Sequence, residues 1–360
     1  MSATNGDQSA RVLVDPTEAQ RLAEEILKAI NVPAENAAVV GRCLVAADLR
    51  GVDTQGINRI PSYLERIQLG ALDPTPQPIV TQVTPVATQV DANNGWGFVA
   101  AHAGMTAAIT SAKTYGIGMA SIKHSNHYGM AAWLVQQAID ADMMSLVFTN
   151  SSPAMPPWGS KTKCVGVSPI ACGAPGKDSA SSFILDMTPS IAARGKIYKA
   201  MRRGEKIPTT WAADSEGRPT DDPAAALKGF MLPLGGPKGS GLALMMDVFA
   251  SVLSGSAFAG HVTGPAEPER VANVGHFLVA IKPDLFLSLD EFKDRMQYLY
   301  DRVVGGEKAA GVERIYFPGE PERLLKLERE KHGIPLAQSE VDALNKEATK
   351  LSVSPLSVLA

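Results

Sequence analysis

The spacing of apolar residues predicts helices at both ends of the chain. Over residues 15–30, Leu22, Ile26 and Ile30 recur at every fourth position and would share one face of a helix. Asp15 stands where a capping side chain would begin that helix. The same reasoning predicts further helices over 33–49, 57–68, 289–304, 321–333 and 339–350. The last two are too short to be stable alone, so we expect them to pack on the N-terminal helices.

The middle of the chain alternates between short apolar strands and helices. A linker rich in proline and threonine leads into short strands expected around 79–91. The pattern then predicts strands over 117–123, 143–150, 166–172, 182–187 and 275–282, and helices over 98–114, 129–141, 190–203 and 239–254. Residues 204–235 are expected to be mostly loop, apart from a short helical run near 223–228. This alternation predicts a mixed α/β fold in which helices pack on a central sheet.

Charge and composition narrow the class of protein. The chain carries 34 basic and 37 acidic residues, a formal net charge of −3, which argues against a nucleic-acid partner. Its most apolar stretch, residues 241–255, contains Asp247 and is too short to span a bilayer, so no membrane partner is expected. The first residues lack the apolar core of a secretory signal. Together with only three cysteines, this predicts a cytoplasmic protein.

One glycine-rich segment, YGIGMAS at 115–121, superficially matches a dinucleotide-binding fingerprint. The Rossmann fingerprint needs a strand before the glycines and a helix that begins at them. Here the predicted order is reversed, because a helix precedes the glycines and a strand follows them. The better interpretation is a glycine that ends a helix and leads into a strand.

Two histidines stand between a predicted strand and a predicted helix. His124 and His127 belong to the segment KHSNHYGMAAWL at 123–134, and such strand ends often carry ligand-binding residues. The alternative is that both only cap the helix or bond to the backbone. A metal site is not expected, because no cysteine cluster or nearby histidine completes a ligand set.

Three other polar features are candidates for ligand contact. Asp186 follows an apolar strand, where it would either cap a helix or contact a ligand. Lys238 lies in GGPKGSG at a predicted helix start, which is typical of an anion site or, alternatively, of a flexible loop. Arg50 and Arg59 flank a tight turn, and an arginine fork can grip a carboxylate unless it simply lies at the surface.

Five segments, in this order along the chain, resemble the type-2 malate/L-lactate dehydrogenase family. They are RGVDTQGINRIPSYL, HSNHYGMA, MPPWGSKTKCVGVSPIACGAPG, LDMTPSIAARGKI and GGPKGSGLALMMDV. The resemblance runs from about residue 15 to PGEPERL at 318–324. That family includes ureidoglycolate and sulfolactate dehydrogenases and diketogulonate and Δ1-piperideine-2-carboxylate reductases.

The resemblance implies a non-Rossmann nicotinamide-binding domain with a mixed sheet, and a helical domain formed by both chain ends. We therefore expect residues 1–14 to be a loose tail, 15–75 and 285–360 to form the helical substrate and dimer domain, and 76–284 to form the NAD(P)-binding domain. It also implies a homodimer that transfers a hydride between NAD or NADP and C2 of a small 2-hydroxy or 2-oxo acid.

The functional residues of the family carry over to matching positions. Arg59 would hold the substrate carboxylate, and His127 would lie at the substrate and exchange a proton with it. The residues implied to line the cofactor cleft are Tyr128, Gly129, Met130, Ser151, Leu185, Asp186, Met187, Lys238 and Gly239.

The chain departs from the family at the residue that usually acts as acid or base. Relatives read Ser-His-Gly where this chain has Thr54, Gln55 and Gly56, and glutamine donates a hydrogen bond but cannot release a proton near neutral pH. A positioned proton donor is worth about 10²–10⁴ in rate. One interpretation is that His127 takes over, since a histidine pKa of about 6.5 suits proton transfer. Otherwise the substrate is an already protonated imine, or the protein binds a cofactor without turnover.

Two further departures concern the substrate. Val167 and Ser168 replace the Thr-Asn pair that relatives often carry before the proline, which removes a polar contact. Lys196 stands where piperideine-carboxylate reductases carry an aspartate, which argues against a standard imine reductase of that branch.

Overall fold

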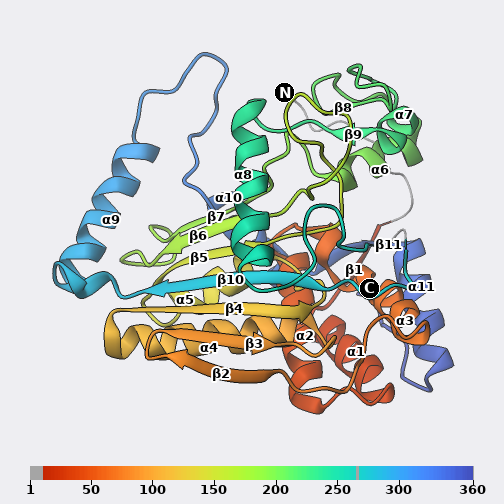
Figure 1. The fold of residues 1–360 in the computed structure, drawn as a ribbon, viewed down its shortest axis with the longest axis horizontal. Helices are drawn as coiled ribbons and strands as arrows, with labels where there is room; N and C mark the ends of the chain where they lie inside the picture. Colours follow the sequence, from red (N-terminus) through yellow and green to blue (C-terminus); the bar gives the residue numbers. More distant parts are fainter. Residues whose placement is uncertain (1–10, 265–266, 360) are drawn as a thin grey trace.

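A seven-stranded mixed sheet forms the centre of the protein, whose computed structural model describes residues 11–264 and 267–359 (Figure 1). In spatial order the strands are β2 (Ile79–Thr84), β3 (Ala87–Asp91), β4 (Ile117–Ser125), β10 (Val274–Ile281), β5 (Met144–Thr149), β6 (Ile170–Ala174) and β7 (Phe183–Met187). Strands β3 and β4 are parallel, and the other neighbours are antiparallel. The predicted mixed α/β fold is confirmed.

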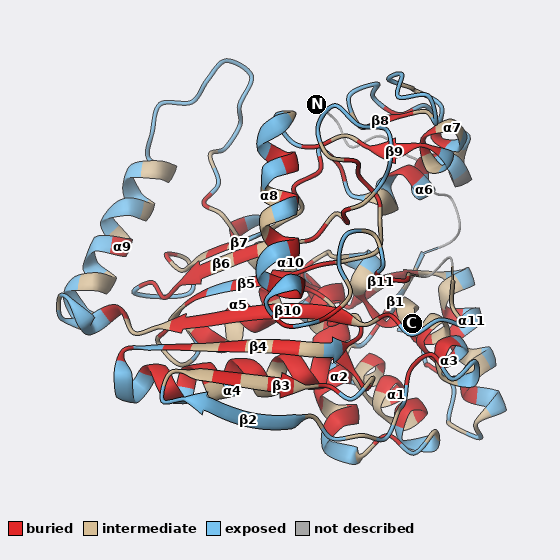
Figure 2. Cartoon of the chain, in the orientation of Figure 1, coloured by how far each residue is buried: buried red, intermediate tan, exposed pale blue. Residues whose placement is uncertain are grey.

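The central strand β10 is buried along nearly its whole length (Figure 2). Leu278 and Ala280 join the core under helices α4 (Gly97–Tyr115) and α5 (Ala131–Ile139). Because successive side chains of a strand point to opposite faces, Phe277 and Val279 join a separate core with Met246 of α8 (Pro237–Asp247). Helix α8 continues into a π-helical turn, η3 (Val248–Val252).

The helices of the two chain ends share one apolar core. It combines Leu22, Leu44 and Tyr63 from the N-terminal part with Leu344 from the C-terminal part. The contributing helices are α1 (Pro16–Ala29), α2 (Ala34–Leu49), α3 (Ile60–Gln68) and α11 (Gln338–Lys350), and α10 (Glu320–His332) contacts α2. The expected return of the last helices to the N-terminal helices is confirmed.

The expectation of a loose tail is wrong for residues 11–14. They form strand β1 (Arg11–Val14), which pairs antiparallel with β11 (Ile334–Ala337). The rest of the expected tail, residues 1–10, lies outside the described residues. The partner strand is more than 300 residues away in sequence, so no local pattern revealed the pairing.

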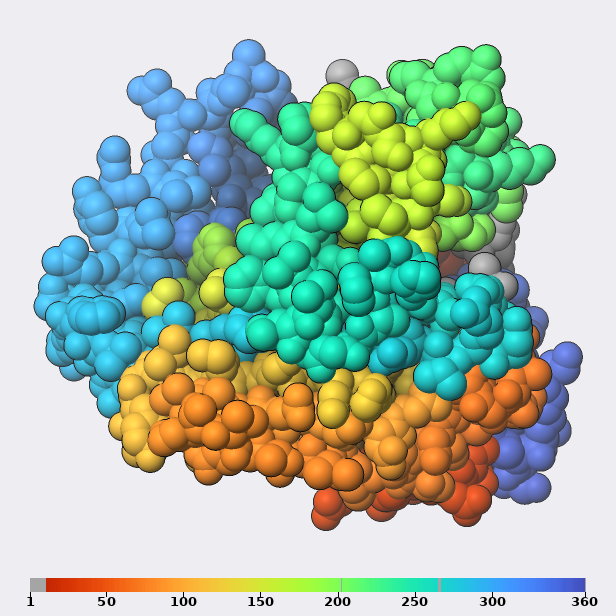
Figure 3. Space-filling model, viewed as in Figure 1, coloured from red at the N-terminus to blue at the C-terminus, as the bar shows by residue number. Residues whose placement is uncertain are grey.

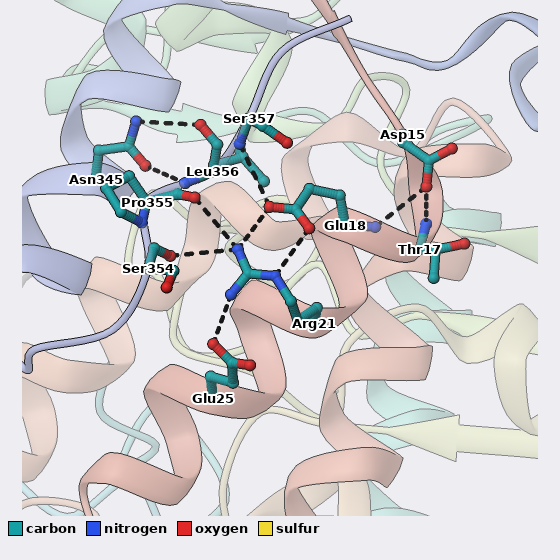
Figure 4. Close-up of polar contacts among 10 residues, drawn as sticks. All are labelled: Asp15, Thr17, Glu18, Arg21, Glu25, Asn345, Ser354, Pro355, Leu356 and Ser357. Atoms are coloured by element: carbon teal, nitrogen blue, oxygen red, sulfur yellow. Dashed lines mark hydrogen bonds and ion pairs between the residues drawn. The ribbon is translucent and has the colours of Figure 1, made fainter.

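The final segment of the chain is fastened to α1 by Arg21 (Figure 4). Its guanidinium donates to the carbonyl oxygens of Ser354 and Pro355, each at 3.2 Å, and pairs with Glu18 and Glu25 at 2.5 Å. Both chain ends therefore brace the helices that precede the site described below.

A small third lobe has its own core. It contains α6 (Arg194–Arg203), β8 (Ala212–Ala213), α7 (Pro223–Lys228) and β9 (Phe230–Met231). Residues 204–235, expected to be mostly loop, thus include a short antiparallel strand pair.

Helix α9 (Leu289–Val304) was expected in the helical domain with residues 285–360, but it packs away from the helices of the chain ends. Its Met296 joins a core with Ala174 of β6 and Phe317, and Phe183 of β7 packs against that core. Among the described residues, no helix has both the length and the apolar character needed to cross a bilayer.

Candidate active site

Two short 3-10 turns, η1 (Asp53–Gln55) and η2 (Ile57–Arg59), connect α2 to α3 and carry three of the predicted site residues. Buried Asp48 of α2 holds them, because its Oδ2 accepts a hydrogen bond of 2.8 Å from the backbone N–H of Ile57. A Cβ atom at Gly56 would lie 1.6 Å from Asp48 Oδ1, so only glycine fits there. Burial raises the pKa of Asp48 well above its usual range, which favours its neutral form.

His127 lies in the loop between β4 and α5 and meets Tyr63 of α3. The Tyr63 hydroxyl is 2.7 Å from Nδ1 of His127. The positive charge of Arg59 acts on the pKa values of both Tyr63 and His127, so the three side chains form one cluster. The structure thus brings together the predicted carboxylate anchor and the predicted proton-transfer residue.

The expectation of an ordinary histidine pKa at this site is wrong. Burial, followed by the charges of Arg59 and His276, lowers the pKa of His127 from 6.5 to about 3. His127 is therefore neutral around pH 7 in the free protein. Tyr63, whose pKa is raised by burial, keeps its proton as well.

Sequence reasoning missed Tyr63. The available signal was its position, because Tyr63 follows Arg59 by four residues and therefore lies on the same face one turn along the helix. Its ring meets the rings of Trp96 and Phe98 edge-on, with centroids 5.7 and 5.8 Å away, which fixes its orientation.

Thr54 and Gln55 lie on η1, and their side chains face residues other than Arg59 and His127. The Oε1 atom of Gln55 is buried and has no hydrogen-bond partner among the described residues. Exposed Thr54 touches the third lobe, since a Cβ atom at Gly195 would lie 2.9 Å from its Cγ2. No hydrogen bond of the described residues joins either side chain to Arg59 or His127.

A buried histidine supports the loop that carries His127. Its Nδ1 lies 2.7 Å from the Thr149 hydroxyl and its Nε2 lies 2.8 Å from the Ser125 hydroxyl. This residue, His276, also contacts the ring of Tyr128 edge-on at 4.7 Å. Burial lowers the pKa of His276 to about 3.

Tyr128, Gly129 and Met130, all predicted to bind the cofactor, continue this loop. Tyr128 and Met130 are buried, and the Tyr128 hydroxyl has no partner among the described residues. Gly129 adopts a φ of 82°, and a Cβ atom there would lie 2.5 Å from Phe98, so glycine is required.

The predicted turn at Leu185, Asp186 and Met187 is the end of strand β7. The Asp186 carboxylate accepts a hydrogen bond of 2.8 Å from the backbone N–H of Ala132 and so caps α5 from another strand. The surrounding protein raises the pKa of Asp186 by desolvation, although part of this residue contacts solvent. The positive charge of nearby Arg50 acts in the opposite direction and lowers the pKa.

Lys238 and Gly239 lie in the first turn of α8, beside the segment that follows β7. A Cβ atom at Gly239 would lie 2.5 Å from the carbonyl oxygen of Pro189. In the same turn, the Ser240 hydroxyl accepts a hydrogen bond of 2.9 Å from the Trp158 backbone N–H. The segment that follows β7 and the backbone of Trp158 therefore both meet the first turn of α8.

These residues fit a nicotinamide dinucleotide. Buried hydroxyls of Ser151, Ser168 and Tyr128 have no partner among the described residues, and such groups need one. Close backbone packing at Gly239 and an exposed lysine beside a helix N-terminus suit an anionic ligand.

Among the residues described, no three His, Cys, Asp or Glu side chains gather as a metal site would require. His124 and His127 turn to different partners, because His124 Nδ1 lies 3.0 Å from Asp91.

Two open surface clefts lie apart from this constellation. One, of about 420 Å³, is lined by His124, His261 and Arg270 among others. The other, of about 570 Å³, runs along α1. Neither includes Arg59, His127 or a residue predicted to bind the cofactor, so the site rests on the side-chain cluster.

Known proteins resemble this chain over nearly its whole length. It is 36% identical over 343 residues to the L-sulfolactate dehydrogenase of Methanocaldococcus jannaschii, covering 95% of this chain and 98% of that protein. The (2R)-3-sulfolactate dehydrogenase (NADP(+)) of Chromohalobacter salexigens is 34% identical, with 92% and 97% covered. The ureidoglycolate dehydrogenase (NAD(+)) of Escherichia coli O157:H7 is 33% identical, with 84% and 86% covered. These names confirm the predicted oxidoreductase class and its NAD or NADP cofactor.

Solved structures agree with the fold. Malate dehydrogenase from Entamoeba histolytica has a TM-score of 0.92 at 29% identity, covering 96% of this chain and 99% of that one. Δ1-piperideine-2-carboxylate reductase from Pseudomonas syringae pvar. tomato has a TM-score of 0.85 at 29% identity, covering 93% and 99%. The model of the malate/L-lactate dehydrogenase family matches residues 14–345. With this match and these relatives, the chain belongs to the malate/L-lactate dehydrogenase family.

Proposed function

We propose that this protein transfers a hydride between NAD or NADP and C2 of a small 2-hydroxy or 2-oxo acid. The observation that carries the proposal is the cluster of Arg59, Tyr63 and His127, in which a cation and a neutral imidazole lie together. The named relatives act on sulfolactate and ureidoglycolate, which supports a substrate of this class.

Each residue of the cluster has a distinct task in this proposal. Arg59 pairs with the substrate carboxylate through its planar fork of N–H donors. His127 exchanges a proton with the oxygen on C2. The bound nicotinamide supplies or accepts the hydride. It would be held by Tyr128, Gly129, Met130, Ser151, Leu185, Asp186, Met187, Lys238 and Gly239.

Substrate binding changes the electrostatics around His127. The charge of Arg59 is one of the causes that lower its pKa. A carboxylate paired with Arg59 cancels much of that charge, so the pKa of His127 rises when substrate binds. His127 becomes a better hydrogen-bonding and proton-accepting group only in the complex.

Gln55 contributes a hydrogen bond rather than a proton. Its amide has donors and an acceptor but does not ionise in this pH range. With Thr54 it completes the turn that faces the third lobe. The proton must therefore come through another residue, and this assigns the task to His127.

A second candidate function is reduction of a 2-imino acid. It is favoured by Gln55, because a protonated imine needs no acid to accept a hydride. The structural relative that reduces piperideine-2-carboxylate supports this class.

Cofactor binding and turnover test the proposal in two steps. NADH and NADPH are titrated against the protein fluorescence, and reduced-nicotinamide absorbance is then followed with a panel of 2-oxo acids and cyclic imines. Turnover of a 2-oxo acid supports the main proposal, and turnover of imines alone supports the second. Binding without turnover on either panel indicates a non-catalytic homologue.

We also propose that the protein is a homodimer. Along α8 and η3, Leu244, Val248 and Val252 form a stripe at four-residue intervals, and they are 41%, 53% and 53% exposed. This segment stands on the face shown in Figure 3. Exposed apolar stripes of this kind mark interaction surfaces. Light scattering should give a dimer mass for the wild type and a monomer mass for Val248→Asp, whereas Val83→Asp on β2 should leave the dimer intact.

We further propose that the protein acts in the cytoplasm and divides into a helical domain (15–75 and 285–360) and an NAD(P)-binding domain (76–284). Three free cysteines suit a reducing compartment. Separate apolar cores under the terminal helices and around the sheet support two domains, except that α9 packs with the sheet. Cell fractionation and limited proteolysis test these two statements.

A further inference from the structure

The contact between Tyr63 and His127 has two possible directions. The phenol donates to a bare Nδ1, or a protonated Nδ1 donates to the phenol oxygen. The direction decides which ring nitrogen of His127 carries the proton. It therefore decides what the histidine presents to a substrate.

The burial of Tyr63 selects between these two directions. Tyr63 is only 5% exposed, so the proton of its phenol needs an acceptor within the protein. Among the described residues, the hydrogen-bond partner for that proton is Nδ1 of His127. A neutral His127 then carries its proton on Nε2.

The surroundings hold this arrangement in place. The Tyr63 ring is wedged edge-on against Trp96 and Phe98, and Phe98 also meets the ring of His127 edge-on at 6.0 Å. Half-buried His127 makes no hydrogen bond through Nε2 to any described residue. The Nε2–H group is therefore available to a ligand.

We propose that Tyr63 is a positioning residue that holds His127 as the Nε2–H tautomer and exchanges a proton with Nδ1 when Nε2 exchanges one with the substrate oxygen. This inference rests on the function proposed above. It adds the source of the proton, which neither Gln55 nor a neutral histidine alone supplies.

The proton steps balance. When a 2-oxo acid is reduced, the hydride leaves the reduced nicotinamide and forms the C2–H bond, while the π bond of C2=O opens onto the oxygen. That oxygen forms its O–H bond as the Nε2–H bond of His127 breaks. The Tyr63 O–H bond breaks as the Nδ1–H bond forms, so His127 stays neutral throughout. The phenolate charge lies beside Arg59 until water returns a proton. Oxidation of a 2-hydroxy acid runs the same steps in reverse.

Nitrogen NMR tests the tautomer without any substrate. With ¹⁵N-labelled histidine, wild-type His127 should show a protonated Nε2 and an unprotonated Nδ1, and Tyr63→Phe should shift both signals towards a tautomer mixture. His276, held by Thr149 and Ser125, is the internal control and should not change. A wild-type His127 protonated at Nδ1 would overturn the proposal whatever the activity.

Kinetics separates this inference from the proposed function. Tyr63→Phe keeps the ring packing and should lower kcat at least about tenfold with little change in KM. When kcat is plotted against the fraction of D₂O in the solvent, the wild type should give a curve and the variant a straight line. Tyr300→Phe, on α9 and packed against the core of Met296 and Phe317, should leave kcat unchanged. Full kcat in Tyr63→Phe together with a large loss in His127→Ala would overturn the relay and leave the proposed function standing. Full kcat in both variants would overturn both.

Discussion

Nη1 of Arg329 on α10 lies 2.6 Å from Oδ1 of Asp53 on the turn that carries Thr54 and Gln55. The same nitrogen also donates to the backbone carbonyl of Asp48. Arg329 is 8% exposed, whereas the Asp53 side chain is 51% exposed, so solvent reaches the contact from the Asp53 side. A residue of the C-terminal part of the chain therefore fixes the turn that carries Thr54 and Gln55.

This contact predicts an effect on both stability and substrate binding. Arg329→Ala should lower the free energy of unfolding by about 1–3 kcal/mol, because it leaves the Asp48 carbonyl and Asp53 without their donor. It should also raise KM for the substrate several-fold. Urea unfolding and steady-state kinetics measure the two effects. Lys326→Ala, which breaks only an exposed pair with Glu330 on the same helix, is the control. Equal behaviour of the two variants would contradict this role of Arg329.

Arg59 is predicted to bind the substrate carboxylate. Arg59→Lys should raise KM by about 10–100-fold, since charged hydrogen bonds contribute about 1.5–3 kcal/mol and a lysine lacks the planar fork. Arg66→Lys is the matched control on the adjoining helix α3, where Arg66 only donates to the Arg270 carbonyl at 2.9 Å. Steady-state kinetics decides, and an unchanged KM in Arg59→Lys would move the anchor elsewhere.

Gln55 is predicted to limit activity on malate-like or lactate-like substrates. Gln55→His restores the acid that relatives carry at this position and should raise kcat/KM on these substrates by about tenfold or more. Gln55→Asn is the control, because it keeps an amide. No gain from histidine would mean that the pocket has changed in more than one place.

The lowered pKa values of His127 and His276 predict a loss of stability in acid. The folded pKa of His276 is about 3, below its ordinary 6.5, so the unfolded chain binds more protons between these values. Stability should therefore fall as the pH drops below about 6.5, by roughly 1.4 kcal/mol per pH unit for each such histidine.

His276→Gln isolates one of these contributions. Chemical unfolding at several pH values should give a lower stability than the wild type at neutral pH but a shallower decline in acid. Parallel pH profiles of the two proteins would show that His276 is not neutral in the fold.

Much of the fold was predictable because its signals are local. Helix α9 spans the predicted 289–304, and Gly116 ends α4 with a φ of 85°, as the reversed glycine pattern indicated. Helix α6 begins at Arg194 rather than at residue 190. The preceding residues instead run alongside another segment, where the backbone N–H of Ile191 bonds to the Leu232 carbonyl. Such pairings depend on distant segments that a local pattern does not contain.

The site was predictable only in part for the same reason. The resemblance selected Arg59 and His127, and the structure places them in one cluster. The depressed pKa of His127 comes from burial by elements far apart in sequence, so the sequence suggested an ordinary value. The role of Arg329 also depends on a contact across 276 residues.

The most direct test of the account compares kcat for His127→Ala and Gln55→Ala with a 2-oxo acid that the wild type reduces, measured by reduced-nicotinamide absorbance. We expect His127→Ala to lose about 10²–10⁴ in kcat and Gln55→Ala to lose far less, because the histidine and not the amide exchanges a proton with the substrate. Similar small losses in both variants would contradict the account and assign the proton to another group.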